Sequence, residues 1–154
     1  SRDRIGIAIR NKPKLFDRTW PSKSRYSMDW FYPILCGVHK KQAAKSLLRA
    51  KWKTFVESEK GCRCVADEPW ITAAETSELT IALASLELRE HAVALLSKIL
   101  WHQDRDGGWW TGHVYLEDIF WPPEKPTWTG AAVILAIDAI EELTHGHRLF
   151  KDHL

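Results

Sequence analysis

The stretch LLSKILWHQDRDGGWWTGHVYLEDIFWPPEKPTWTGAAVILAIDAI, residues Leu95 to Ile140, decides the fold. It begins with an apolar segment of helical spacing that ends near Gln103. A long loop rich in tryptophan and proline follows, from Asp104 to Pro126. A second segment, almost wholly apolar, begins at Thr127. We therefore expect a helix, a functional loop and a buried helix, in that order.

Helical spacing of apolar residues predicts more helices on both sides of this loop. The expected segments are a remnant up to Arg10, a short helix between Ser27 and Gly37, and longer helices over Lys40–Val56, Thr72–Leu88, Glu90–His102 and Trp128–Leu143. The start of the short helix stays open, because Ser27 could be its N-cap or Pro33 its first residue. Gly146 is the expected C-cap of the last helix.

The sequence contains a repeat that predicts how these helices pack. Trp70-Ile71-Thr72-Ala73-Ala74 aligns with Trp128-Thr129-Gly130-Ala131-Ala132, and each segment follows a proline-containing loop and opens an apolar helix. Amphipathic and fully apolar helices alternate, which indicates an outer and an inner layer. We therefore expect an all-α fold, a partial α/α toroid of about three helical hairpins, with a small β-hairpin in the last long loop.

The length of 154 residues predicts a single domain over residues 1–154. The chain starts at Ser1 as if a helix were already under way, so we expect it to be the C-terminal half of a larger toroid. The open flank of such a half ring would be covered by the N-terminal half of the same protein or by a homodimer mate.

Composition excludes several function classes. A net charge of +2 does not favour nucleic acid as a partner, and no apolar run has the roughly 18 residues of a transmembrane segment. Three cysteines, an odd number, and the lack of a signal peptide favour the cytoplasm. Nine tryptophans, several of them in loops, suggest either large core residues or a surface on which a ligand stacks.

The loop motif Gln103-x-x-x-Gly107-x-Trp109, with Leu95, Leu96 and Leu100 before it, resembles the QW repeat of terpenoid cyclases and related prenyltransferases. Segments 24–33, 64–79 and 106–112 resemble bacterial prenyltransferase-like proteins about twice as long, and more distantly the six-hairpin glycosidases share the toroid. The resemblance implies an isoprenoid diphosphate as ligand. The chain has no DxDD motif and no clear DDxxD motif, both of which cyclase chemistry uses.

The first of three readings, a prenyltransferase-like or cyclase-like protein, is the function we expect, and the other two stay open as alternatives. A prenyltransferase-like or cyclase-like transferase would hold an isoprenoid diphosphate in an aromatic cavity, with Mg²⁺ as its cofactor in that case. A carbohydrate-active, glycosidase-like enzyme would stack sugars on aromatic rings and use two carboxylates, about 5–5.5 Å or roughly 6.5–9.5 Å apart according to the stereochemistry. A non-catalytic scaffold would bind a small-molecule ligand only. We expect no metal centre, since Cys62, Cys64, His102 and His113 follow no zinc spacing.

The candidate site residues lie at the starts of the inner helices and in the last loop, where free N–H groups would face the cavity. The candidate catalytic carboxylates are Asp29, Glu68 and Glu75, each of which could instead cap a helix. The candidate substrate-binding residues are Trp30, Tyr32, Trp70, Trp109, Trp110, His113, Tyr115 and Trp128. Glu78 lies in the same region.

Overall fold

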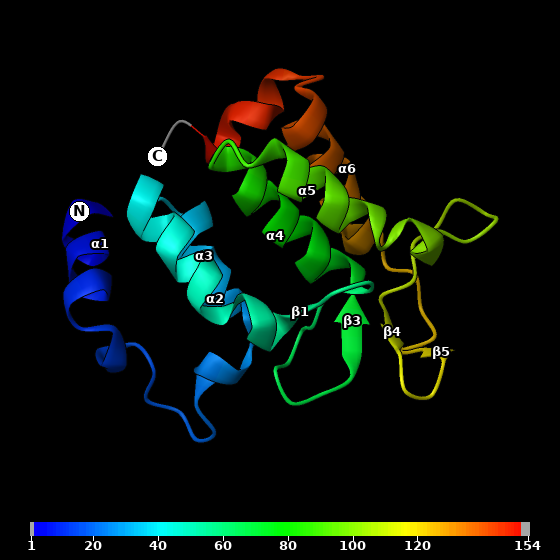
Figure 1. Cartoon of the computed structure of the whole chain (residues 1–154), viewed down its shortest axis with the longest axis horizontal. Coiled ribbons are helices and arrows are strands. Elements are labelled where there is room, and N and C mark those ends of the chain that lie inside the picture. Colours follow the sequence, from blue (N-terminus) through cyan, green and yellow to red (C-terminus); the bar gives the residue numbers. More distant parts are fainter. Residues whose placement is uncertain (1, 152–154) are drawn as a thin grey trace.

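Six α-helices form the framework of the described part of the chain (Figure 1). The computed structural model describes residues 2–151. The helices are α1 (Arg2–Asn11), α2 (Ser27–Leu35), α3 (Lys41–Phe55), α4 (Ala73–Ser85), α5 (Arg89–Ser97) and α6 (Thr127–Glu141). Short 3-10 turns cover Pro13–Leu15, Lys23–Arg25, Leu100–His102 and His145–Phe150. The periodicity therefore located every long helix, and α2 begins at Ser27 with Pro33 inside it.

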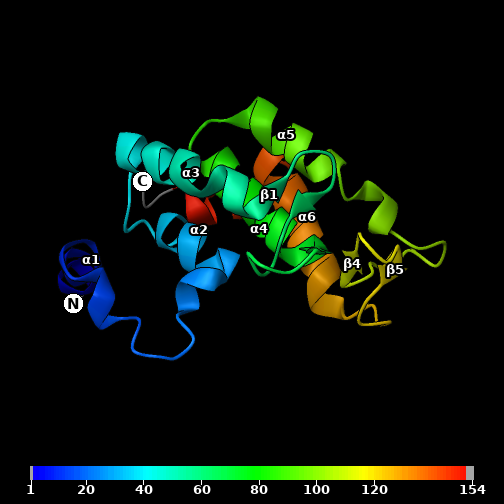
Figure 2. The same ribbon diagram turned by 60° about the horizontal axis from the view of Figure 1, so that its bottom comes forward.

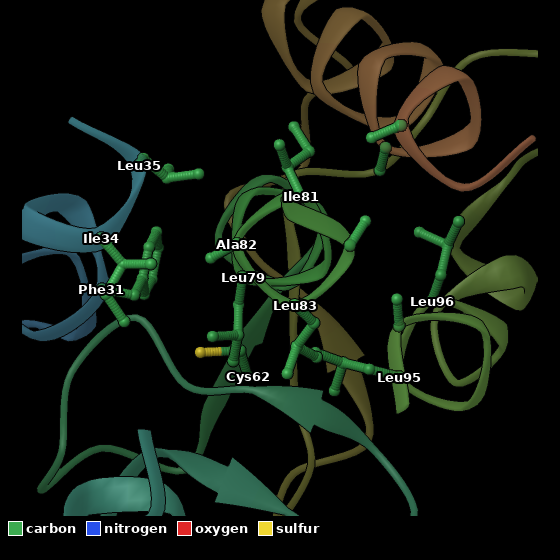
Figure 3. Packing of buried hydrophobic residues seen from close by; sticks show 14 of the residues in the cluster. Phe31, Ile34, Leu35, Cys62, Leu79, Ile81, Ala82, Leu83, Leu95 and Leu96 are labelled. Carbon is green, nitrogen blue, oxygen red and sulfur yellow. The ribbon is translucent and has the colours of Figure 1, made fainter. Parts of the chain in front are cut away.

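Helix α4 is the centre of the fold. It packs against α2 on one side and against α5 and α6 on the other, as both views show (Figures 1 and 2). Every one of its residues except Glu78 is buried. Leu79, Ala82 and Leu83 point from α4 towards neighbouring elements in Figure 3. The sequence predicted that this helix would be buried on most sides, because it is apolar nearly all round, and the structure confirms that prediction.

The expectation of an all-α partial toroid is wrong, because the fold is mostly α and contains two small antiparallel sheets. One sheet pairs β1 (Val56–Glu57) with β2 (Gly61–Cys62). The other has the order β3 (Trp70–Thr72), β4 (Gly112–Val114), β5 (Ile119–Phe120). The β4–β5 hairpin was expected in the last loop, but β3 belongs to the preceding connector. Backbone N–H and C=O groups of two loops satisfy each other across this ladder.

Gly112 explains why β3 and β4 come so close. A Cβ atom at this position would lie 2.5 Å from Trp70 Nε1 and 2.6 Å from the Ile71 carbonyl oxygen. Only a residue without a side chain allows this approach. The sheet lies at the end of the helices where α4 and α6 begin (Figure 1), so the two connectors meet at one end of the molecule.

The last helix differs from its prediction in two ways. The side chains of Ile134 and Leu135 are 68% and 43% exposed, so one face of α6 is apolar and open, whereas burial on most sides was expected. The C-cap of α6 is Glu142, in the left-handed conformation at φ 55°, and Gly146 lies beyond it in a 3-10 turn. Asp138 accepts hydrogen bonds from Thr144, which closes this turn against the helix.

Candidate functional site

A tyrosine and a glutamate from two packed helices form the most distinctive polar contact of the chain. The hydroxyl of Tyr32, on α2, donates to both carboxylate oxygens of Glu78, on α4, at 3.1 and 3.0 Å. Burial raises the pKa of Glu78 to about 7; the Tyr32 hydrogen bond opposes this shift and the nearby Glu75 carboxylate adds to it. Burial beside Glu78 also raises the pKa of Tyr32. Glu78 can therefore hold or release a proton near neutral pH.

Glu75 lies one turn before Glu78 on the same side of α4 and is almost fully buried. Its Oε1 atom accepts a bond from the Cys64 thiol at 3.5 Å, and its Oε2 atom has no hydrogen-bond partner among the described residues. Burial, together with the Glu75 carboxylate, raises the pKa of Cys64 to about 12, so this thiol stays protonated. The carboxylate at position 75 thus lies beneath the surface, next to the partly exposed Tyr32–Glu78 pair.

A hollow of about 540 Å³ reaches this pair through Tyr32, and Glu78 is not among its lining residues. We call it the α2 hollow, and its lining residues are Ile9, Phe16, Lys23, Tyr26, Met28, Asp29, Tyr32, Pro33, Cys36 and Val38. Two of the predicted site residues, Asp29 and Tyr32, therefore share one cavity. The walls are mostly apolar or aromatic, with a single carboxylate and a single ammonium group at the rim. Such a mixture is typical of small-molecule sites.

A second hollow, of about 450 Å³, contains two other predicted site residues, Glu68 and Trp70. We call it the β3 hollow, and it is lined by Arg25, Val65, Glu68, Pro69, Trp70, Val114, Glu117, Ile119 and Trp121. Arg25 holds Asp67 through both carboxylate oxygens at 3.0 and 3.2 Å, and this lowers the pKa of Asp67. Glu68 and Asp29 thus line different hollows, and Glu75 lines neither.

The remaining predicted residues are spread over the fold. Trp30 is 1% exposed and belongs to the core, where it stacks on Phe55 and donates to the Leu47 carbonyl at 2.9 Å. Trp109 packs partly buried against the core, and Tyr115 accepts cation–π contacts from Lys60 and Arg63. The last long loop and the start of α6 carry the other three, Trp110, His113 and Trp128.

Those three residues have distinct surroundings. Trp110 stacks on Phe120, and the Lys125 ammonium lies over its ring. His113 is buried and contacts Asp118 through Nε2 at 3.1 Å. Trp128 is 54% exposed at the first turn of α6. None of the three lines either hollow.

The buried polar groups do not form a metal centre. Across residues 2–151, no group of three His, Cys, Asp or Glu side chains is placed to hold a metal ion. His102 is buried beside Trp101 and His113, and neither of its ring nitrogens has a hydrogen-bond partner among the described residues. Burial lowers the pKa of His102 to about 4. It is therefore a neutral ring packed among aromatic side chains. Over the same residues, no helix is long and apolar enough to cross a membrane.

Aromatic hollows and a carboxyl group that titrates near pH 7 are features of carbohydrate-cleaving sites. The chain is similar to a mannosidase. Over 148 residues, 96% of its length, it is 40% identical to the protein named MMP endo-(1,4)-3-O-methyl-alpha-D-mannosidase of Mycolicibacterium hassiacum. The chain spans 40% of the length of that relative. No family model matches the chain.

This similarity points to a glycosidase-like protein and agrees with the carbohydrate-active alternative of the sequence analysis. It lends no support to the prenyltransferase-like resemblance or to an isoprenoid diphosphate as ligand. The sequence analysis named Glu78 in the region of the candidate site without choosing it. The signal was its spacing of three residues from Glu75 on a helix that is otherwise buried, although its partner Tyr32 lies 46 residues away.

Proposed function

We propose that this chain forms part of a glycoside hydrolase site that cleaves an α-mannosidic bond in an oligosaccharide carrying methyl ethers. The observation that carries the proposal is the 40% identity, over nearly the whole chain, to a protein named as an endo-mannosidase of 3-O-methylated mannose. The Tyr32–Glu78 pair supports it, because Tyr32 lines the α2 hollow and is hydrogen-bonded to a carboxyl group suited to acid catalysis.

Glu78 is the general acid in this proposal. A carboxyl group with a pKa near 7 is about half protonated at neutral pH. It gives its proton to the glycosidic oxygen as the bond between that oxygen and the sugar C1 breaks, and the leaving sugar departs as an alcohol. Tyr32 acts as a positioning residue, because its hydroxyl fixes both oxygens of the carboxylate that remains.

Asp29 is the second carboxylate, because it lines the same hollow as Tyr32. In this role it faces the positive charge that develops at C1, either as the nucleophile or as the base that takes a proton from the attacking water. The neighbouring Glu75 carboxylate raises the pKa of Glu78 and so favours the protonated form of the acid. Glu68, in the β3 hollow, takes part in binding.

The walls of the α2 hollow suit a methylated sugar. A methyl ether replaces a hydroxyl donor with apolar surface, so it gains from contact with apolar side chains instead of hydrogen bonds. Phe16, Met28 and Val38 supply such surface, and Tyr26 and Tyr32 offer ring faces to the apolar side of a sugar. An unmethylated mannose chain would leave its hydroxyl at this wall without a partner.

The test is the hydrolysis of an α-(1→4)-linked, 3-O-methylated mannose oligosaccharide, measured as the release of new reducing ends. We expect cleavage of this substrate, slower cleavage of the unmethylated analogue, and at least a hundredfold loss of kcat in Glu78→Gln. Tyr26→Phe is the matched control, because it removes a hydroxyl from the same hollow without touching Glu78.

Thermal-shift measurements separate the proposal from the isoprenoid reading. Stabilisation by the methylated oligosaccharide, and none by geranylgeranyl diphosphate with Mg²⁺, is the expected result. Stabilisation by the diphosphate alone, or full activity in Glu78→Gln, would contradict the proposal.

A further inference from the structure

The β3 hollow has an aromatic floor that is held rigidly. The side chain of Trp121 is 52% exposed, and its ring meets Trp70 edge-on with 5.3 Å between ring centroids. Trp70 Nε1 donates to the Trp121 carbonyl at 2.8 Å, and the Trp121 N–H donates to the Gly112 carbonyl at 2.9 Å. Both backbone polar groups of Trp121 are thus satisfied, and its half-exposed indole packs edge-on against Trp70.

Polar groups surround this floor in an arrangement that suits sugar hydroxyls. Glu68 and Glu117 are exposed and line the hollow, and their carboxylates are able to accept hydrogen bonds from a ligand. Arg25 is fixed by its two bonds to Asp67. A sugar ring has an apolar face that stacks on an indole ring and an edge of hydroxyls that donate to carboxylates. The β3 hollow offers a partner for each, the Trp121 indole for the face and the carboxylates of Glu68 and Glu117 for the edge.

Consecutive residues of the chain line the β3 hollow and the α2 hollow. Arg25 lines the β3 hollow, and the next residue, Tyr26, lines the α2 hollow. This segment is pinned in place, because the Ala66 N–H donates to the Arg25 carbonyl at 2.8 Å and Tyr26 forms a β-bridge with Val65. The two hollows therefore meet along this segment, the Arg25–Tyr26 ridge, which a chain-like ligand would cross to occupy both.

We propose that the β3 hollow is a second saccharide subsite, which holds sugar units that flank the bond cleaved at the α2 hollow. The inference rests on the proposed function and extends it to the length of the substrate. The Trp121 indole stacks on a sugar ring, and Glu68 and Glu117 accept bonds from its hydroxyls. The protein therefore gains affinity with each sugar unit that crosses the Arg25–Tyr26 ridge.

The test is calorimetric titration of 3-O-methylated mannose oligosaccharides of two and eight units, with Glu78→Gln as the background to prevent cleavage. We expect the longer chain to bind at least tenfold more tightly. Trp121→Ala should lose at least fivefold more affinity for the long chain than for the short one, while Trp121→Phe keeps most of it. Trp20→Ala is the matched control, since Trp20 is 95% exposed and lines neither hollow.

The outcomes separate the two proposals. Equal affinity for both lengths, or an equal loss for both in Trp121→Ala, overturns the subsite. If wild-type protein binds the long chain through Trp121 but releases no reducing ends, the subsite stands and the proposed hydrolysis falls. Failure to bind either oligosaccharide overturns both. A melting curve of each variant confirms that the fold is intact.

Discussion

Removing the Tyr32 hydroxyl should make Glu78 a weaker acid. The hydroxyl donates to both oxygens of the ionised carboxylate, so it stabilises the charged form and holds the pKa of Glu78 below the value that burial alone would set. Tyr32→Phe keeps the ring in the α2 hollow and deletes only this donor. The pKa of Glu78, now about 7, should therefore rise.

The size of the shift follows from the exposure of the pair. A hydrogen bond to a charged group contributes about 1.5–3 kcal/mol, and because Tyr32 is 38% exposed we take roughly half of that. One pKa unit corresponds to about 1.4 kcal/mol, so the pKa of Glu78 should rise by roughly 0.5–1 unit. The limb of the pH–rate profile that reports the acid should move upward by the same amount.

The assay is a pH titration of ¹³C-labelled glutamate side chains by NMR, in wild-type protein and in Tyr32→Phe. Tyr26→Phe serves as the control, because Tyr26 lines the same hollow and makes no bond to Glu78. An unchanged or lower pKa in Tyr32→Phe would refute the reasoning. So would a shift of equal size in the control.

Stability gives further predictions. Glu78→Gln should stabilise the protein at pH 8 and not at pH 4.5. A carboxyl group whose folded-state pKa is raised to about 7 contributes stability that is lost as the pH rises from its ordinary 4.5 through 7, by roughly 1–2 kcal/mol once solvent screening is allowed for. Urea unfolding at both pH values measures this difference, and an equal effect at both would contradict it. Burial lowers the pKa of His102 from 6.5 to about 4. The stability that the neutral His102 ring contributes to the folded state is therefore lost as the pH falls from 6.5 to 4. In His102→Gln, the free energy of unfolding should fall less steeply over this pH range. Gly112→Ala should lower stability by about 2 kcal/mol or more, since its Cβ would lie 2.5 Å from a Trp70 ring atom. In Gly130→Ala the nearest atom to the new Cβ is Trp109 Cδ1 at 3.6 Å, and the helix loses a glycine, so the free energy of unfolding should rise by up to about 1 kcal/mol. Similar melting temperatures for Gly112→Ala and Gly130→Ala would refute the packing argument.

Local patterns predicted much of the fold. The spacing of apolar residues located α3 to within two residues and showed that α4 would be covered on most sides. The β4–β5 hairpin was also foreseen, because its strands are separated by a four-residue turn. These features depend on residues close together in the chain, and their signals are local for the same reason.

Non-local contacts were missed. β3 pairs with β4 across more than forty residues, with Trp70 opposite Val114, and no short motif announces such a ladder. The exposed face of α6 was missed because an apolar sequence shows that a helix seeks cover without showing which side receives it. The candidate site also depends on a contact between residues far apart in the sequence. Asp29 and Glu78 could be placed near inner-helix starts, but Tyr32 became the partner of Glu78 only through the packing of α2 on α4.

The ladder shared by β3, β4 and β5 has a consequence for how this molecule can vary. One connector supplies β3 and the other supplies β4 and β5, and Trp70 is hydrogen-bonded to the end of that hairpin. An insertion or deletion in either connector would slide the pairing by a residue and turn alternate side chains to the opposite side. Changes of loop length in one segment should therefore be accompanied by compensating changes in the other, and grafting either loop alone onto a related scaffold should fail.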